Sequence, residues 1–222
     1  MPRVTTISQP TRSWSISTEL RHQERESSPR HHINPAGCDH RSAWFHGGAP
    51  STLGRVDSTT RRIVTRRLAD VDLDAVVVLS LAAWAPVFAS LEQQLGAGIF
   101  AMIYPDWRRA QAAAVRAVCL DEGNDVRVAC VDDRVVGFVA VGLVAEDAAQ
   151  ACEIHMIAVD PEHQRSGVGS ALMRQALAVA EAHGVELAVI ATGGDPGHAP
   201  ARALYERFGF RPLPRVRYYR TV

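Results

Sequence analysis

Hydrophobic positions in residues 61–222 follow two different spacings, and each change of spacing marks the boundary of a predicted element. Apolar residues that alternate with polar ones, or run on for a few positions, predict strands, and apolar residues three or four apart predict helices. The predicted strands cover residues 62–68, 126–131, 135–144, 151–159, 185–192 and 214–220. The predicted helices cover residues 73–85, 107–120, 170–183 and 198–208.

The order of these elements predicts an α/β fold built on a mixed sheet. The run Asp132-Asp133-Arg134 between the second and third strands is a short polar turn typical of a hairpin. The first half of the sheet is therefore expected to be antiparallel. The third helix crosses from the fourth strand to the fifth, and a helical crossover of this kind makes the two strands parallel.

Polar residues and a proline set the expected ends of the first two helices. Asp70 and Asp72 are expected to cap the first helix, and Pro86 is expected to end or kink it. A loop or a short helix is expected over residues 87–104. Asp106 follows a proline and is expected to cap the second helix.

Residues 1–60 follow neither spacing and are expected to form a disordered tail before a single domain, 61–222. The tail contains Cys38 and five histidines, but none of these residues has the spacing of a zinc site, so a polar tail is favoured over a metal site. No metal is expected elsewhere in the chain. The histidines are His22, His31, His32, His40 and His46.

Composition and charge narrow the class of function. The formal net charge is zero, which argues against nucleic acid or an anionic membrane as the main partner. No apolar run is expected to approach the length of a membrane span, and the N-terminus lacks the apolar core of a signal peptide. Cys119, Cys130 and Cys152 lie in apolar surroundings and are expected to be small core residues. A soluble cytoplasmic protein is expected, and whether it forms a homodimer is left open.

The segment between the fourth strand and the third helix has the chemistry of an anion site. After Val159 come a proline turn, then Arg165, and then Gly167 and Gly169 at the start of the helix. The first turn of a helix leaves N–H groups without partners in the helix, and both the helix dipole and Arg165 favour negative charge. Glycine has no Cβ, so a ligand can come close to the backbone. The sequence therefore predicts a pyrophosphate cradle.

Two segments resemble motifs of the GNAT superfamily of acyl-CoA N-acyltransferases. Gln164-x-x-Gly167-x-Gly169 matches the cofactor motif Q/R-x-x-G-x-G/A. Residues 198–210 resemble N-x-x-A-x-x-L-Y-E-x-x-G-F, with His198 in place of the usual Asn. The resemblance covers about residues 61–222. The matching positions of the second motif are Ala201, Leu204, Tyr205, Glu206, Gly209 and Phe210.

The resemblance implies a fold and an acetyl donor. The mixed sheet is expected to carry helices on both faces and to splay after the fourth strand, with acetyl-CoA lying in the splay. Backbone groups of the fourth strand would pair with the pantetheine amides, and the cradle would hold the pyrophosphate. The residues expected to bind the cofactor are Ile157, Ala158, Val159, Gln164, Arg165, Ser166, Gly167, Val168, Gly169, Ser170 and His198.

The resemblance also implies an N-acetyltransferase in which a primary amine attacks the thioester directly. The amine must first lose a proton, and Glu153 is the first candidate for the base, with His155 second. Alternation along the fourth strand would place both on one face together with Ile157 and Val159. The alternative is that they only hydrogen-bond at a sheet end or shape the acceptor pocket.

Tyr205 matches the tyrosine that protonates the leaving thiolate in this family, and the alternative for it is helix packing. A phenol with an ordinary pKa near ~10 stays protonated and can donate. Asp195, in a flexible glycine-rich turn, would bind a cationic acceptor or cap the turn. The candidate walls of the acceptor pocket, which are aromatic residues more often found in cores, are Trp84, Phe88, Tyr104 and Trp107.

Two other functions are weighed against an enzyme. A catalytically silent acyl-CoA-binding regulatory domain would keep the cradle but lack a working base or acid, and the presence of Glu153 and Tyr205 argues against it. An interaction protein working through residues 1–60 is disfavoured because that segment has no amphipathic stripe.

Overall fold

The computed structural model describes residues 62–146 and 149–222, so the expected tail lies outside the described residues. The helices are α1 (Leu73–Ile103), α2 (Trp107–Leu120), α3 (Val168–Ala182) and α4 (Ala199–Arg207). The strands are β1 (Val64–Arg67), β2 (Asn124–Val131), β3 (Arg134–Glu146), β4 (Ala149–Val159) and β5 (Leu187–Ile190). Three short 3₁₀ turns precede α1, α3 and α4, namely η1 (Asp70–Asp72), η2 (Pro161–His163) and η3 (Pro196–His198).

The five strands form one sheet in the order β1-β2-β3-β4-β5, which confirms the predicted mixed sheet. Strands β1 to β4 pair antiparallel, and β4 pairs with β5 in parallel across the α3 crossover. The predicted hairpin turn joins β2 to β3, and Asp132 and Asp133 both take left-handed backbone angles, with φ of 49° and 61°. Two left-handed residues give the turn the twist that matches the flanking strands.

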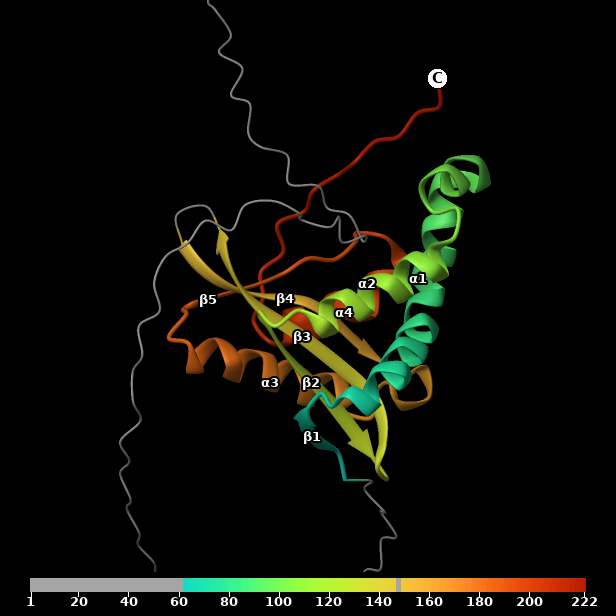
Figure 1. Cartoon of the computed structure of the whole chain (residues 1–222). Coiled ribbons are helices and arrows are strands. Elements are labelled where there is room, and N and C mark those ends of the chain that lie inside the picture. Colours follow the sequence, from blue (N-terminus) through green and yellow to red (C-terminus); the bar gives the residue numbers. More distant parts are fainter. Residues whose placement is uncertain (1–61, 147–148) are drawn as a thin grey trace, which may run out of the picture. The chain divides into compact units, whose positions relative to one another are not determined.

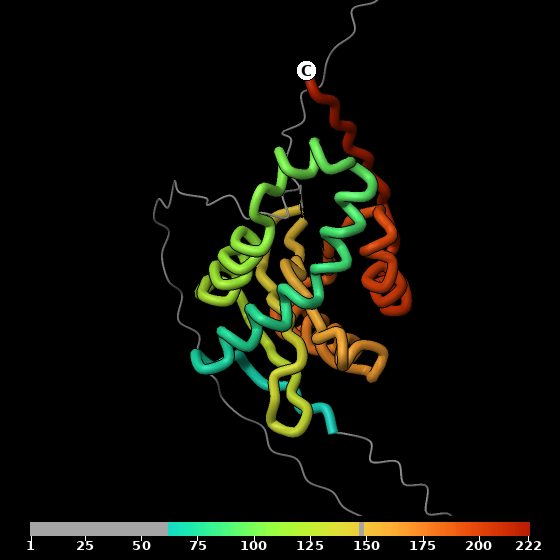
Figure 2. The backbone as a smooth tube through the Cα atoms, turned by 90° about the vertical axis from the view of Figure 1, so that its right-hand side faces the viewer, coloured from blue at the N-terminus to red at the C-terminus, as the bar shows by residue number. Residues whose placement is uncertain are grey.

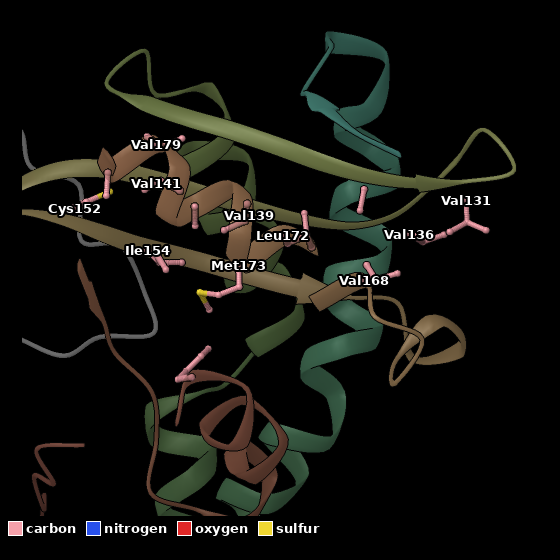
Figure 3. Close-up of a cluster of buried hydrophobic side chains, with 14 residues drawn as sticks. Val131, Val136, Val139, Val141, Cys152, Ile154, Val168, Leu172, Met173 and Val179 are labelled. Atoms are coloured by element: carbon pink, nitrogen blue, oxygen red, sulfur yellow. The ribbon is translucent and has the colours of Figure 1, made fainter. Parts of the chain in front are cut away.

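Each face of the sheet carries its own apolar core, and helices cover both faces (Figure 1). On one face, Val139 and Ile154 of the sheet pack against Leu172 and Met173 of α3, as Figure 3 shows. On the other face, valines of α1 and α2 pack against β2, β3 and β4. The amphipathic faces read from the sequence are therefore buried as expected.

The three cysteines of the described chain are buried and unpaired, which confirms their expected role as core residues. Burial raises the pKa of the Cys119 thiol to about 11, because the thiolate would lose its hydration. Burial also raises the pKa values of Cys130 and Cys152.

Helix α1 is longer than the sequence pattern predicted. It contains Pro86 and continues to Ile103, and its kink lies at Gly96, whose backbone is not helical (φ 75°, ψ 152°). Figure 2 shows the upper part of α1 bending over toward α2. Proline removes one backbone hydrogen bond, but Val87 and Phe88 directly after it are buried, and their packing offsets that loss.

The expectation that no apolar run approaches the length of a membrane span is also wrong. Residues 70–103 are long and apolar enough to cross a membrane by length and composition, whereas no such run was expected. In the most apolar window, 33% of the residues are buried inside the protein. Val76 and Leu79 lie in the core beneath the sheet, so α1 is a partly buried core helix.

The predicted final strand, residues 214–220, is wrong. Residues 211–222 have no regular structure and are exposed along their whole length. Val216 and Tyr218 alternate with arginines, but no core residue packs over them. Alternation predicts a strand only where a neighbouring strand and an apolar layer are available to bury one face.

Asp72 does not cap α1 through its side chain, contrary to prediction. Its buried carboxylate accepts two hydrogen bonds from Arg66 of β1, at 2.5 and 2.9 Å, and one from the N–H of Ala69 at 2.8 Å. The Arg66 guanidinium holds the pKa of Asp72 below its usual range, against the opposing effect of burial. Asp72 therefore ties the start of α1 to the first strand.

Asp72→Asn is expected to lower the free energy of unfolding by about 1–2 kcal/mol near neutral pH, since Arg66 is partly exposed and water weakens the pair. The folded pKa of Asp72 lies below its unfolded value of about 3.9. The stabilisation is therefore complete above that value and is lost as the pH falls through the folded pKa. Denaturant unfolding at about pH 7 and about pH 3 measures it, with the exposed Asp74→Asn as control. An equal difference at both pH values would contradict the assignment.

Candidate functional site

Strands β4 and β5 separate halfway along β4. Parallel pairing joins Ala151–Ile154 to Leu187–Ile190, and beyond Ile154 no strand of residues 62–146 or 149–222 pairs with β4 on that side. At the same place the β3–β4 register shifts: Val141 pairs with Ile154 and Ala140 with Met156, so His155 is the extra residue of a β-bulge. The sheet therefore opens beside the bulge, which confirms the predicted splay.

The opening exposes backbone groups at the end of β4. The side-chain Nε2 of Gln164 donates to the carbonyl O of Val159 at 3.2 Å, while the N–H of Asp160 donates to β3. Val159 therefore directs its polar groups away from β3. Because this direction alternates along a strand, Ile157 also directs its N–H and C=O into the opening, whereas Ala158 faces β3 and has a buried side chain.

The bulge changes which side chains share a face. Ile154 and Ile157 both pack against the core under α3, although residues three apart in a regular strand face opposite sides. The extra residue, His155, explains this change of face. Glu153 therefore lies on the face of α1 and α2, opposite to Ile157 and Val159, and the predicted common face for these residues is wrong.

Glu153 and His155 do lie together on that face. His155 Nδ1 is 3.6 Å from Glu153 Oε2, and their side chains are 27% and 35% exposed. A Cβ added to Gly142 of β3 would lie 2.5 Å from His155 Nε2 and 2.6 Å from Asn124 Oδ1, so the imidazole rests directly over the backbone of β3. The pair is partly accessible to solvent and lies next to the bulge where the sheet opens.

The predicted cradle occupies the start of α3. Gly167 is the N-cap residue with φ of 95°, and Arg165 also has a left-handed backbone, with φ of 60°. The first helical bond runs from the N–H of Ala171 to the carbonyl O of Gly167, at 3.0 Å. The N–H groups before Ala171 have no helical partner. Among the residues that the structure describes, a Cβ on Gly167 would have only Ile63 within 4 Å, at 3.7 Å, so these residues leave the space before the helix open.

Arg207 brings a second guanidinium to this cradle, and the sequence pattern did not predict it. Arg207, in the last turn of α4, donates from Nη2 to Ser170 Oγ at 2.9 Å. Leu204 of α4 packs against Gly169, whose added Cβ would lie 3.3 Å from Leu204 Cδ2. Arg207 lies 37 residues from Ser170, and only the folded position of α4 brings the two together. Its place in the second motif is the one sequence signal that could have pointed to it.

Tyr205 of α4 belongs to the same apolar core as Ile157 and Val159 of β4. It is 8% exposed and belongs to the core under α3, and its ring lies 6.3 Å from that of Phe210. Burial raises the pKa of Tyr205 to about 12, because the phenolate would be poorly hydrated there. The hydroxyl therefore keeps its proton throughout the physiological range and is present as a hydrogen-bond donor.

His198 and Asp195 form a buried pair before α4. His198 Nδ1 bonds to Asp195 Oδ1, and Asp195 is 4% exposed. Burial by itself would raise the pKa of Asp195, but the hydrogen bond from His198 and its charge lower the pKa below its usual range. The backbone N–H of Gly197 donates to Ser90 Oγ of α1 at 3.0 Å, so the turn expected to be flexible is anchored.

The predicted aromatic walls separate into two groups. Phe88 stacks on Trp107 at 4.2 Å between ring centroids and meets Tyr104 edge-on at 5.5 Å. These three residues line a pocket of about 320 Å³ between the end of α1 and the start of α2. Trp84 is not among its lining residues and instead packs against the core under α1.

Comparisons with known proteins agree with this geometry. The family model described as Acetyltransferase (GNAT) family matches residues 94–210. A mycothiol acetyltransferase from Beutenbergia cavernae is 44% identical over 71 residues, which is 32% of this chain and 23% of that protein. The match therefore spans less than a quarter of the length of this curated relative.

Solved structures with low sequence identity share the fold. A mutant of the BH1408 protein from Bacillus halodurans superposes with a TM-score of 0.57 and 15% identity, over 72% of this chain and 99% of that chain. An aminoglycoside antibiotic 6'-N-acetyltransferase from Acinetobacter haemolyticus superposes with a TM-score of 0.50 and 16% identity, over 72% and 98% of the two chains.

Proposed function

The chain belongs to the acetyltransferase (GNAT) family, whose members take the acetyl group from acetyl-CoA, and we propose that it transfers this group to a primary amine by direct attack in a ternary complex. The observation that carries the proposal is the opening between β4 and β5, with the cradle at one end and Glu153, His155 and Tyr205 around it.

In this proposal the backbone of β4 and the start of α3 bind acetyl-CoA. Ile157 and Val159 direct N–H and C=O groups into the opening, where they match the amides of pantetheine as an added strand would. The N–H groups at the start of α3, with Arg165 and Arg207, suit the pyrophosphate. Gln164 is already bonded to Val159 and would order the turn between them.

The reaction needs two proton transfers, one from the amine and one to the departing thiolate, and different residues are proposed for each. A primary amine is protonated near neutral pH and must lose a proton before it attacks. Glu153 is proposed as the acceptor of that proton, with His155 beside it as the second candidate. Tyr205 is proposed to donate to the sulfur of the departing CoA, since its raised pKa keeps the phenol protonated.

The aromatic pocket at Phe88, Tyr104 and Trp107 is proposed to hold the rest of the acceptor. Its aromatic walls, with Phe88 stacked on Trp107, suit an apolar or cationic group, and Asp106 adds an acidic side chain to the lining. A silent acyl-CoA-binding domain is the competing function, and it predicts donor binding without acetyl transfer.

Release of free thiol from acetyl-CoA tests the proposal directly. The full chain is expected to release thiol with at least one member of a panel of primary amines: an aminoglycoside, spermidine, free amino acids and a peptide with a free N-terminus. Acetyl-CoA binding without thiol release for any of these amines would favour the silent domain.

Glu153→Gln is expected to lower kcat by about 100-fold with the best amine of the panel, because the amide cannot accept the ammonium proton. Acetyl-CoA affinity measured by calorimetry should stay the same, since the side chain lies on the opposite face from Ile157 and Val159. Glu181→Gln, on the exposed side of α3, is the matched control and should keep full activity. An unchanged kcat in Glu153→Gln, together with a large loss in His155→Asn, would assign the base to His155.

A further inference from the structure

The buried pair of His198 and Asp195 is not used in the chemistry described so far. Asp195 Oδ1 holds His198 Nδ1, and both side chains are shielded from solvent. In the part of the chain that the structure describes, His198 Nε2 makes no hydrogen bond. An imidazole with one nitrogen fixed by a carboxylate and the other open is oriented to accept a proton at the open nitrogen.

The surroundings fix this pair in place. Arg202 of α4 donates to the carbonyl oxygens of Gly193 and Asp195, at 2.6 and 2.8 Å. A Cβ on Gly193 would overlap Asp195 Oδ1 and the His198 ring. A Cβ on Gly197 would lie 2.8 Å from both Val87 Cα and Ser90 Cβ of α1. The turn therefore packs closely against α1. A loop that only connected β5 to α4 at the surface would not need such close packing.

His198 lies at the start of α4, the helix that carries Tyr205, the proposed proton donor to the departing thiolate. His198, Ala201 and Tyr205 are spaced three and then four residues apart, and Ala201 and Tyr205 pack on the same side of α4. His198 thus lies on the side that carries Tyr205, about 10 Å away along the axis at 1.5 Å per residue. It occupies the end of α4 that meets α1, where the preceding Gly197 contacts Val87 and Ser90.

The reaction needs a second proton acceptor. An ammonium loses two protons when it becomes an amide nitrogen: one before it attacks, and one after the new N–C bond forms. Until the second proton leaves, the nitrogen carries positive charge and is expelled more easily than the thiolate. Removal of the second proton therefore commits the adduct to breakage of the C–S bond.

We propose that His198, oriented by Asp195, accepts this second proton on the α4 side of the opening. The inference rests on the proposed amine acetylation. The first proton goes to Glu153 and then to solvent, and the second goes to His198 Nε2. Tyr205 gives its proton to the CoA sulfur as the C–S bond breaks. After CoA leaves, His198 loses its proton to solvent and Tyr205 regains one from solvent. Two protons leave nitrogen, one ends on CoA, and one reaches solvent.

The charged groups around the pair suit this role. Asp195 is an anion that stabilises the imidazolium once it forms, and Ser90 of α1 lies beside it. The guanidinium of Arg202 is directed at carbonyl oxygens. Burial raises the pKa of Tyr104, the C-cap residue of α1; Tyr219 and Asp195 add to the rise and Arg217 opposes it, so Tyr104 stays neutral.

The test uses the full chain, acetyl-CoA and the panel amine with the fastest thiol release. His198→Ala and His198→Asn are both expected to lower kcat by about 100-fold. Their Kd values for acetyl-CoA, measured by calorimetry, should stay within about threefold, which also shows that the variants are folded. Free imidazole in the buffer should restore part of the activity of His198→Ala. His183→Asn, at the exposed end of α3, is the control and should behave as the wild type.

The asparagine variant separates proton transfer from simple contact. Asn is the usual residue at this motif position, so full kcat in His198→Asn with a loss in His198→Ala would overturn the proposal in favour of a contact with acetyl-CoA. Loss of acetyl-CoA binding in both variants would overturn it in the same way. Unchanged kcat in both variants would show that the pair is only structural. Absence of thiol release by the wild type would instead overturn the proposed function, and this inference with it.

Discussion

Gly167→Glu is expected to weaken acetyl-CoA binding by at least about 100-fold. Gly167 is the N-cap of α3, and the space in front of it is open. A carboxylate there would occupy the cradle and repel a pyrophosphate. The loss of two charge-assisted hydrogen bonds, at about 1.5–3 kcal/mol each, corresponds to about 3 kcal/mol or more. Calorimetric titration of acetyl-CoA into the wild type and the variant measures this loss.

Gly184→Glu supplies the matched control for this experiment. Gly184 follows α3 at its other end, has φ of 65°, and has no atom of the described residues within 4 Å of an added Cβ. Both substitutions place the same side chain on a left-handed backbone and should cost similar stability, about 1 kcal/mol. Only the change at Gly167 should affect binding. Equal loss of binding in both variants would indicate damage to α3 as a whole rather than a blocked cradle.

Tyr205→Phe is expected to lower kcat by about 100-fold or more with acetyl-CoA affinity little changed. The substitution removes the hydroxyl and keeps the ring that packs in the core under α3. Without the donor, CoA must leave as an unprotonated thiolate, and general acid catalysis is commonly worth factors of about 10²–10⁴. Steady-state thiol release and calorimetric titration measure the two quantities separately. A variant with normal kcat and reduced stability would assign Tyr205 to packing alone.

The pH dependence of the wild type provides an independent check on Tyr205. The acid must be protonated to act, and burial raises its pKa to about 12. Its contribution should therefore persist across the alkaline range and fall only as the pH approaches that value. The same shift stabilises the fold below the unfolded pKa of about 10, and this stabilisation is lost as the pH rises through the folded pKa. An alkaline limb near pH 8 that Tyr205→Phe abolishes would contradict the raised pKa.

Several features of the site were predictable because they depend on nearby residues in the chain. The hairpin at Asp132 and Asp133 needs only a two-residue polar turn between apolar runs. Asp106 caps α2 by accepting from the N–H of Arg109 at 3.1 Å, three residues away. The cradle at Gly167 is likewise a local consequence of glycines at the start of a helix.

Other features depend on contacts between distant segments, which no local pattern specifies. The register shift at His155 is set by pairing with β3, and it moves Glu153 to the face opposite Ile157 because a strand has a period of two. Helix α1 continues past Pro86 because the residues that follow are buried, with Phe88 stacked on Trp107 of α2. Alternation at residues 214–220 gave a wrong strand because no layer covers it.

The sequence by itself determined the order of the four helices and of strands β1 to β5, the glycine N-cap of α3, and which side chains carry groups able to accept or donate protons. Each of these follows from residue chemistry or from hydrogen bonds within a few positions. Only the tertiary structure decided which of those side chains meet. The bond from Gly197 to Ser90 spans 107 residues, and the bond from Arg207 to Ser170 spans 37. Such contacts form when packing of the whole chain offsets the entropy of closing long loops, and that balance is a property of the fold rather than of any segment.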